Sequence, residues 1–494
     1  MTAANGAGRM IVRGASASVA GLGVRLGARL LFLVAAAQLY GAELFGAYSL
    51  AVAAIELAVA IGGLGMKKLL FQHLDERGER PAEHVLADAV LLVALASLAL
   101  AGAVMATVAL LPEAIVSANS ARAIFWLAPM ILGQALIDVL LAATRWRHLI
   151  RYEVAARSIV EPYAALAAAV AAFYAGYATG GLLIGYWAGT LAALAFAAAG
   201  ARRCLGPFAP GAWRLRAGRL RAMLRGALAN TATDALSGLF LRLDLYLVGI
   251  LMGERTAGIY GMARQLAQPI RQVRQGFDGL LTPLVAKTLH RDGPARAASA
   301  IASATRLMLA LQLPMVVAMC AVGYPLLHWL GPEFAVGWVA AILLGCAETV
   351  QGAYGIGDLM FVYRRPRLGL QIYGAIVGVA LLTGYALTSA FGIDGAAAAV
   401  LVTYVVRSWL RRAVLKARLG VGVPIHHSLG PILAGGAGAS AALLLAPFGW
   451  PAALAAGLGL YGALLFAWLR LAGETLALRD FSEMALPGRG ADLD

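Results

Sequence analysis

Polar residues recur at helical spacing inside the apolar segment 256–286. They are Arg264, Gln268, Arg271, Gln275, Asp278 and Thr282. At about 100° per residue they fall within an arc of roughly 80° on one helix face. An arginine in the hydrocarbon core costs roughly 2.5–3.5 kcal/mol on insertion scales, so it normally faces a bundle interior or a water-filled cavity. The stripe therefore predicts a cationic pathway through a membrane, suited to an anionic substrate.

Other arginines are candidates for the same cavity. Arg25 and Arg29 are one helical turn apart in the segment 17–39, so they share a face. We assign both to the substrate cavity, and the alternative for Arg25 is that it snorkels to the membrane surface. Arg274 lies off the axis of the stripe. It is assigned to the cavity as well, with pairing to a carboxylate on a neighbouring helix as the alternative.

A second polar stripe lies in the segment 222–251, where Asn230, Asp234, Ser237 and Asp244 share an arc of about 80°. Its aspartates, together with Asp278, are candidates either for coupling to an ion or for charge pairing with the arginines. Both alternatives stay open from sequence.

A proline and several acidic residues also lie inside the apolar segments, where they are uncommon. Pro269 removes a backbone hydrogen bond within 256–286, which predicts a kink and a hinge there. The other acids in apolar segments are expected to have interior partners, and they are Glu56, Asp138, Glu161, Glu348 and Asp358.

The composition indicates an integral membrane protein made of helices. The chain is 61% hydrophobic and only 13% charged, with a mean hydropathy of +0.79, whereas a soluble protein has about 25% charged residues. Apolar segments long enough to cross a hydrocarbon core of about 30 Å recur throughout. We predict an all-α protein with fourteen transmembrane helices, near 17–39, 45–66, 84–111, 122–143, 154–177, 180–200, 222–251, 256–286, 298–322, 335–360, 368–390, 394–415, 429–446 and 451–471.

The placement of basic residues supports this count. With fourteen crossings and both termini in the cytoplasm, the loops on the outer side hold only Arg122 and Arg255 of the 40 basic residues. This pattern predicts a multi-pass protein of the inner cell membrane. The net charge of +15 then reflects cytoplasmic loops, so the expected partners are anionic phospholipids and not nucleic acid.

The sequence contains no motif for covalent chemistry. A P-loop G-x-x-x-x-G-K-[ST], an H-E-x-x-H and a G-x-S-x-G are all absent, and the three cysteines form no metal or disulfide pattern. We therefore expect neither an enzyme nor a cofactor or metal. A membrane polymerase or ligase for polysaccharides is the weaker alternative, because it would need a sizeable outer loop.

The chain contains an internal repeat. Residues 39–48 and 251–260 both read L-x-G-x-x-x-x-G-x-Y, and weaker echoes pair 111–113 with 331–333 and 145–147 with 364–367. Repeats six spans apart have the same membrane orientation, so they predict two halves related by an axis along the membrane normal. The predicted organisation is a six-helix lobe at 10–200, a basic cytoplasmic linker at 201–221, a second lobe at 222–415, two additional helices at 429–471 and a cytoplasmic tail at 472–494.

These motifs resemble a known family. Four motifs carry the resemblance: the turn after the first span, Leu243-Asp244 before Tyr260-Gly261-Met262-Ala263, the turn at 330–334 and the start of span twelve at 392–397. In their order and spacing they are similar to the polysaccharide-repeat (O-antigen or exopolysaccharide) flippases of the multidrug/oligosaccharidyl-lipid/polysaccharide (MOP) exporter superfamily. The P-N-x-x-R run typical of the lipid II flippases is absent.

The resemblance implies a structure and a function. Two lobes would form a V around a central cavity, and alternating access would carry an undecaprenyl-diphosphate-linked oligosaccharide to the outer leaflet. A polysaccharide polymerase and glycosyltransferases would be partners in this pathway. The alternative within the superfamily is an ion-coupled multidrug antiporter.

Overall fold

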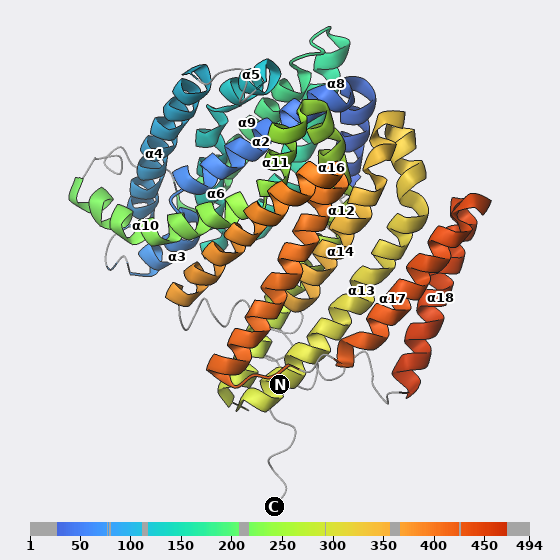
Figure 1. Cartoon of the computed structure of the whole chain (residues 1–494). Coiled ribbons are helices and arrows are strands. Elements are labelled where there is room, and N and C mark those ends of the chain that lie inside the picture. Colours follow the sequence, from blue (N-terminus) through green and yellow to red (C-terminus); the bar gives the residue numbers. More distant parts are fainter. Residues whose placement is uncertain are drawn as a thin grey trace, which may run out of the picture. The chain divides into compact units, whose positions relative to one another are not determined.

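The described part of the chain is helical and contains no strand (Figure 1). The structure is a computed structural model, and it describes residues 27–76, 78, 81–110, 117–206, 217–291, 293–355, 366–423 and 426–471. Arg25, Asp358 and the side chains of Asp278 and Thr282 lie outside the described residues. The predicted all-α class is confirmed.

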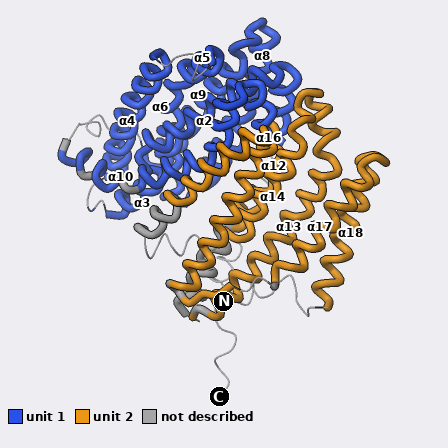
Figure 2. Tube along the Cα trace, in the orientation of Figure 1, with its two compact units in different colours: residues 1–261 blue, residues 262–494 orange. Residues whose placement is uncertain are grey.

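The chain divides into two compact units, residues 1–261 and 262–494 (Figure 2). Unit 1 contains a helix from residue 27, then η1 (Ala36–Tyr40), α2 (Gly41–Gly62), α3 (Met66–Asp75), α4 (Ala82–Leu110), α5 (Ala118–Leu127), α6 (Met130–Trp146), α7 (Arg151–Ala155), η2 (Ala156–Val160), α8 (Glu161–Tyr174), α9 (Gly181–Leu205), α10 (Ala217–Phe240) and α11 (Leu243–Met252). The helix α12 (Glu254–Arg291) begins in unit 1 and continues into unit 2, which also holds α13 (Gly293–Leu330), η4 (Pro332–Gly337), α14 (Trp338–Tyr354), α16 (Pro366–Leu419), α17 (His426–Leu445), η6 (Ala446–Phe448) and α18 (Trp450–Leu471).

Two long helical stretches are hairpins. The rings of Phe32 and Tyr48 lie 6.0 Å apart, although a straight helix would separate residues at this spacing by about 24 Å. In α16 the hydroxyls of Thr383 and Thr403 lie 3.5 Å apart, where a straight helix would place them about 30 Å apart. The chain therefore folds back between each pair, at Gly41 (φ 72°) and at Gly392 (φ 63°, ψ −139°), because glycine tolerates a positive φ.

The described helices match the predicted spans in position. Nine are long and apolar enough to cross a membrane, or up to eleven if two bent pairs are single spans. The two hairpins each supply two of the predicted segments, and α12, which carries the polar stripe, is not among the nine. Every predicted span overlaps a helix or a hairpin arm. The chain is a multi-pass membrane protein, and the count of fourteen crossings stays a prediction.

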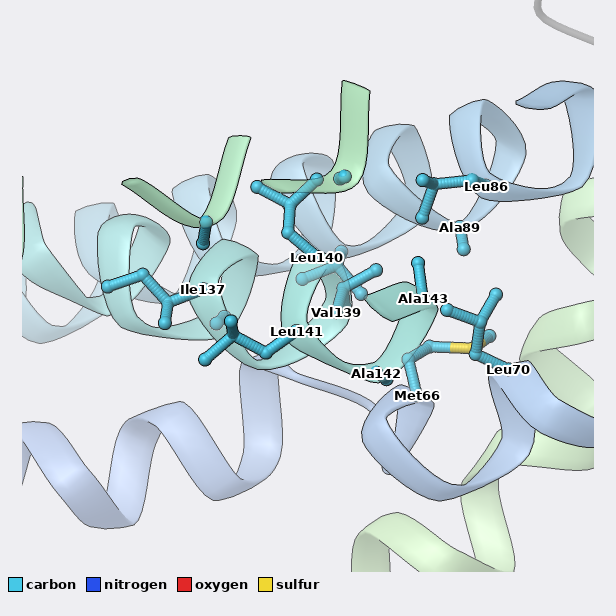
Figure 3. Packing of buried hydrophobic residues seen from close by; sticks show 14 of the residues in the cluster. Met66, Leu70, Leu86, Ala89, Ile137, Val139, Leu140, Leu141, Ala142 and Ala143 are labelled. Carbon is cyan, nitrogen blue, oxygen red and sulfur yellow. The ribbon is translucent and has the colours of Figure 1, made fainter. Parts of the chain in front are cut away.

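The largest apolar cluster of unit 1 joins α3, α4, α6, α9 and α10. Figure 3 shows Met66 and Leu70 of α3, with Leu86 and Ala89 of α4, lying toward residues 139–143 of α6. The packed residues are aliphatic and many are alanines, so the helix backbones approach closely. In a membrane such close packing, rather than burial from water, holds helices together.

Small residues also bring α9 onto α8. A Cβ added at Gly185 would lie 2.7 Å from the carbonyl oxygen of Ala165, and one added at Gly189 would lie 2.7 Å from that of Glu161. The two glycines are four residues apart, the small-xxx-small pattern of membrane helix contacts. Their packing fixes the position of Thr190 beside the first turn of α8.

The two copies of the sequence repeat pack against each other. A Cβ added at Gly46 of α2 would lie 1.9 Å from the carbonyl oxygen of Glu254, and one added at Gly258 of α12 would lie 1.9 Å from that of Ala42. Corresponding glycines of the repeat therefore make reciprocal contacts. The Glu254 side chain also accepts hydrogen bonds from Ser117 and from the backbone N–H of Ser120 at the start of α5.

The two C-terminal helices pack on α13 in unit 2. Gly438 of α17 and Gly457 of α18 meet at backbone distance, and the Tyr461 hydroxyl donates to the carbonyl oxygen of Ala310, 3.0 Å away. By their packing, α10 and α11 belong to unit 1, whereas the sequence repeat assigns them to the second lobe. The lobe boundaries taken from the repeat stay a prediction.

The reciprocal glycine contact predicts a stability change. Gly46→Ala or Gly258→Ala should lower the free energy of unfolding by about 1–3 kcal/mol, the usual cost of overpacking, and should lower the thermal unfolding temperature in detergent. The matched control is Gly102→Ala on α4, where an added Cβ meets nothing within 4 Å. An unchanged unfolding temperature in both α2 and α12 variants would contradict this contact.

Candidate functional site

The stripe of α12 lies in unit 2 and faces several environments. Arg264 and Gln268 are half-buried, and Gln275 is exposed. Ala267 and Ile270, which lie between Arg264 and Gln275 in the sequence of this helix, are buried. The described stripe is thus partly covered by neighbouring helices and partly open.

Arg271 is held by Glu348 of α14. Its Nε donates to Glu348 Oε2 across 3.0 Å, and its Nη2 donates to Oε1, so the pairing is two-pronged. The Glu348 side chain is 8% exposed and that of Arg271 28% exposed. Such a fork-to-fork ion pair both neutralises the charge and fixes the plane of the guanidinium.

Arg274 binds the end of α14. Its Nη1 donates to the carbonyl oxygens of Gln351 and Gly352, each 3.0 Å away, and Arg411 of α16 donates to that of Tyr354 across 2.9 Å. Two arginines therefore satisfy carbonyls that a helix end leaves unpaired, where the helix dipole favours positive charge. The cavity role of Arg274 stays a prediction.

Helix α12 runs through Pro269 without interruption. Next to this proline, Gln312 of α13 donates its side-chain amide to the carbonyl oxygen of Ile270 across 2.8 Å. The hinge at Pro269 stays a prediction.

The second stripe is interrupted by a bend. Residues 230–240 of α10 and helix α11 meet at 49°, so the single face expected for Asp234 and Asp244 is not continuous. Asp234 pairs with Lys68 of α3 at 2.6 Å, and Asp244 accepts a hydrogen bond from the Tyr260 hydroxyl at 2.7 Å. Asp234 is thus paired with a lysine, whereas the partners expected from sequence were the arginines, and both ion coupling and pairing with the arginines stay predictions.

Further charges of unit 1 lie near the first hairpin. Arg242, which precedes α11, forms an ion pair with Glu56 of α2. Arg29 is half-buried.

A polar cluster of unit 1, which we term the Arg157 cluster, joins four elements. Its members are Gln134 and Asp138 of α6, Arg157 of η2, Glu161 of α8 and Thr190 of α9. Arg157 donates to Asp138 Oδ1 at 2.5 Å, to Glu161 Oε2 at 2.8 Å and to Gln134 Oε1 at 2.7 Å. The Gln134 amide nitrogen donates to Glu161 Oε1 at 2.9 Å and to Thr190 Oγ1 at 3.0 Å.

Sequence reasoning did not single out Arg157, which the structure places at the centre of this polar cluster. The spacing of Arg157 and Glu161, four residues apart, was the available signal, since such pairs meet on one helix face. Asp138, Glu161 and Glu348 each have a partly buried or buried partner, as expected for intramembrane acids. Glu56 also has a partner, Arg242, but its side chain is exposed. No group of three metal-ligating side chains occurs in the described part of the chain.

Comparison with solved structures identifies the fold. The structure matches the lipid II flippase MurJ in an inward closed conformation with a TM-score of 0.75 and 12% identity, over 92% of this chain and 100% of that one. It matches an inward-facing multidrug resistance MATE family transporter of the MOP superfamily with a TM-score of 0.65 and 11% identity, over 80% and 98% of the two chains. The protein is a multi-pass membrane protein with the fold of the MOP superfamily transporters.

Comparison of the sequence identifies the family. A model of the family described as "Polysaccharide biosynthesis protein" matches residues 36–344, and the chain belongs to this family. Comparison with curated protein sequences gives no match.

The Arg271–Glu348 pair predicts a large coupling energy. Arg271→Gln or Glu348→Gln alone should destabilise the protein by about 3–5 kcal/mol, the usual cost of leaving a buried charge unpaired. The double variant should lose much less than the sum, as measured by thermal unfolding of the four proteins in detergent. The control is the half-exposed pair Arg145–Glu153, whose coupling should stay below about 1 kcal/mol. Additive effects at Arg271 and Glu348 would contradict the pairing.

Proposed function

We propose that this protein moves a lipid-diphosphate-linked oligosaccharide from the cytoplasmic to the outer leaflet of the inner membrane, for polysaccharide biosynthesis. Its family is described by polysaccharide biosynthesis. The solved structure with a TM-score of 0.75 is a lipid II flippase. Membership of the family and this fold support the substrate class.

The chemistry of the substrate explains why arginines are needed. A diphosphate does not cross hydrocarbon unaided, because removing an ion from water is costly. The lipid tail, in contrast, already lies in the bilayer. A cavity in which guanidinium groups bind phosphate oxygens lets the head group cross while the tail stays in lipid.

The Arg271–Glu348 pair is the observation that carries this proposal. A carboxylate and a phosphate present similar pairs of oxygens to a guanidinium. We assign to Glu348 the role of occupying Arg271 while the substrate is absent, which avoids an uncompensated charge in the membrane. The phosphate then displaces Glu348 from Arg271. Arg264, Gln268 and Gln275, on the same face of α12, are the further substrate-binding residues of the proposal, with Arg25 and Arg29 in the first half.

Alternation of inward- and outward-open states completes the transport cycle, with Pro269 as the proposed hinge. The sequence has no P-loop for ATP, so direction would come from an ion gradient, the membrane potential or consumption of the product outside. Asp234, Asp244 and Asp278 are the proposed coupling residues. Glycosyltransferases that build the substrate and a polymerase that consumes it are the proposed partners.

A multidrug antiporter is the second candidate. The fold match to MATE transporters supports it, and so does an aromatic pair beside an acid in unit 1. The rings of Tyr48 and Tyr186 lie 6.4 Å apart, and the charge of Glu56 acts on both. Aromatic rings and carboxylates would suit an organic cation, whereas the stripe of α12 suits an anion.

Topology gives the first test. Cysteine labelling in intact cells should place residues 201–221, residues 364–367 and the C-terminus in the cytoplasm, and residues near Glu254 and Glu333 outside. The reason is the segregation of basic residues. Labelling of the C-terminal tail from outside would contradict the fourteen-span arrangement.

Arg271 gives the test of function. Arg271→Ala should reduce translocation of a lipid-linked oligosaccharide in proteoliposomes by one to three decades, since losing one charge-assisted contact costs about 2–5 kcal/mol. Lysine should restore only part of the rate, because an ammonium lacks the planar fork. Arg470→Ala, at the end of α18, is the control that removes a positive charge elsewhere in unit 2.

The neutral pair Arg271→Gln with Glu348→Gln separates function from folding. It leaves no buried charge unpaired, so the protein should stay folded while translocation stays low. Glu348→Gln alone should bind the head group more tightly than the native protein, because the competing carboxylate is gone. Full translocation by this double variant would mean that Arg271 only holds α14 in place and does not bind the substrate.

A further inference from the structure

Two glycines of α14 flank Glu348 on one helix face. Gly345 lies three residues before Glu348 and Gly352 lies four residues after it, a spacing that places all three on the same side of the helix. A Cβ added at Gly345 would lie 3.2 Å from Cδ1 of Ile270 on α12. One added at Gly352 would lie 2.5 Å from Oε1 of Gln312 on α13. Two neighbouring helices therefore approach α14 closely, one on each side of Glu348 along the helix.

Ile270 of α12 is held at two points. Its side chain, 1% exposed, packs on Gly345. Its carbonyl oxygen accepts a hydrogen bond from the side-chain amide of Gln312 at 2.8 Å, and Gln312 is itself fully buried against Gly352. These two contacts fix the position of the α12 backbone along α14. Arg271, the next residue of α12, therefore starts from a defined place.

We propose that Gln312 is a positioning residue, which holds the substrate-binding guanidinium of Arg271 in place. This inference rests on the proposed function, because Arg271 must be the residue that binds the phosphate. The hydrogen bond from Gln312 to Ile270 uses no atom of Arg271 or of Glu348. It therefore persists when a phosphate displaces Glu348, so the backbone beneath the guanidinium does not have to be ordered when the substrate binds.

The hydrogen bonding of the Gln312 amide is incomplete. Its Nε2 donates to the carbonyl oxygen of Ile270, but its Oε1 is buried and has no hydrogen-bond partner in the described part of the chain. A buried acceptor without a partner destabilises a protein, and an apolar side chain of similar length would avoid this cost. What the amide adds at this position is therefore its contact to the residue before Arg271.

The experiment measures how tightly the full-length protein in detergent binds a prenyl-diphosphate sugar, by calorimetric titration. Gln312→Met keeps the length of the side chain and removes the donor. It should raise the dissociation constant about three- to tenfold, the equivalent of one net hydrogen bond. The thermal unfolding temperature should change little, because the buried acceptor without a partner is removed as well.

A second measurement shows whether Gln312 acts through Arg271. Arg271→Lys should weaken binding in the native background, because the planar fork is lost. In the Gln312→Met background the same lysine substitution should weaken binding much less, since the guanidinium is already displaced there. Residues that act as a unit give such non-additive effects. Additive effects of the two substitutions would overturn the inference.

Thr305→Val is the matched control. Thr305 of α13 is buried and donates to the carbonyl oxygen of Ala353 on α14 at 3.0 Å. The control thus removes a hydrogen bond between α13 and α14 without touching the one to α12, and it should keep the native dissociation constant. A second variant, Gln312→Asn with Gly352→Ala, keeps the number of buried carbon atoms but shortens the amide. It should bind as weakly as Gln312→Met.

The outcomes separate the inference from the proposed function. Native affinity in both Gln312 variants overturns the inference and leaves the proposed function in place. Equal weakening by Gln312→Met and Thr305→Val does the same, because it would assign the effect to general packing of α13 on α14. Absence of binding by the native protein, or native affinity in Arg271→Lys, overturns the proposed role of Arg271 and the inference with it.

Discussion

An ionised side chain at membrane depth must have an opposite charge or strong hydrogen-bond acceptors or donors close by. Without water, an isolated arginine or carboxylate costs several kcal/mol, and this cost exceeds what most single helix contacts return. Arg271 with Glu348, Arg157 with Asp138 and Glu161, and Arg242 with Glu56 each meet this constraint between different helical elements or helical turns. The ion pairs therefore fix how helices face one another as well as where charge can be stored.

The same constraint gives a transporter for anions its means of changing state. A substrate that carries two negative charges can bind arginines only if their resident partners withdraw or become protonated. In unit 2 the proposal assigns the first response to Glu348. This response keeps the charge inside the membrane nearly constant while the head group crosses.

Small residues make these pairings reachable. Gly189 lets α9 approach α8 at the level of Glu161, which places Thr190 within hydrogen-bonding distance of Gln134. Gly46 and Gly258 likewise allow α2 and α12 to approach closely, at the place where the two copies of the repeated motif contact each other. Close backbone packing holds membrane helices together, and here it also brings the polar side chains into contact.

The sequence by itself determined the all-helical membrane class, the positions of the spans, the repeat and the polar face of α12. These features depend on local hydrophobicity and on the fixed angle between successive residues of a helix, which a sequence displays directly. The family also followed from local motifs. Only the tertiary structure decided the partners. It paired Arg271 with a residue 77 positions away, placed Arg274 on the carbonyls of α14 and bent the span of Asp234 and Asp244 by 49°. Which side chains meet across helices depends on packing between segments distant in the chain, and helical periodicity carries no information about that.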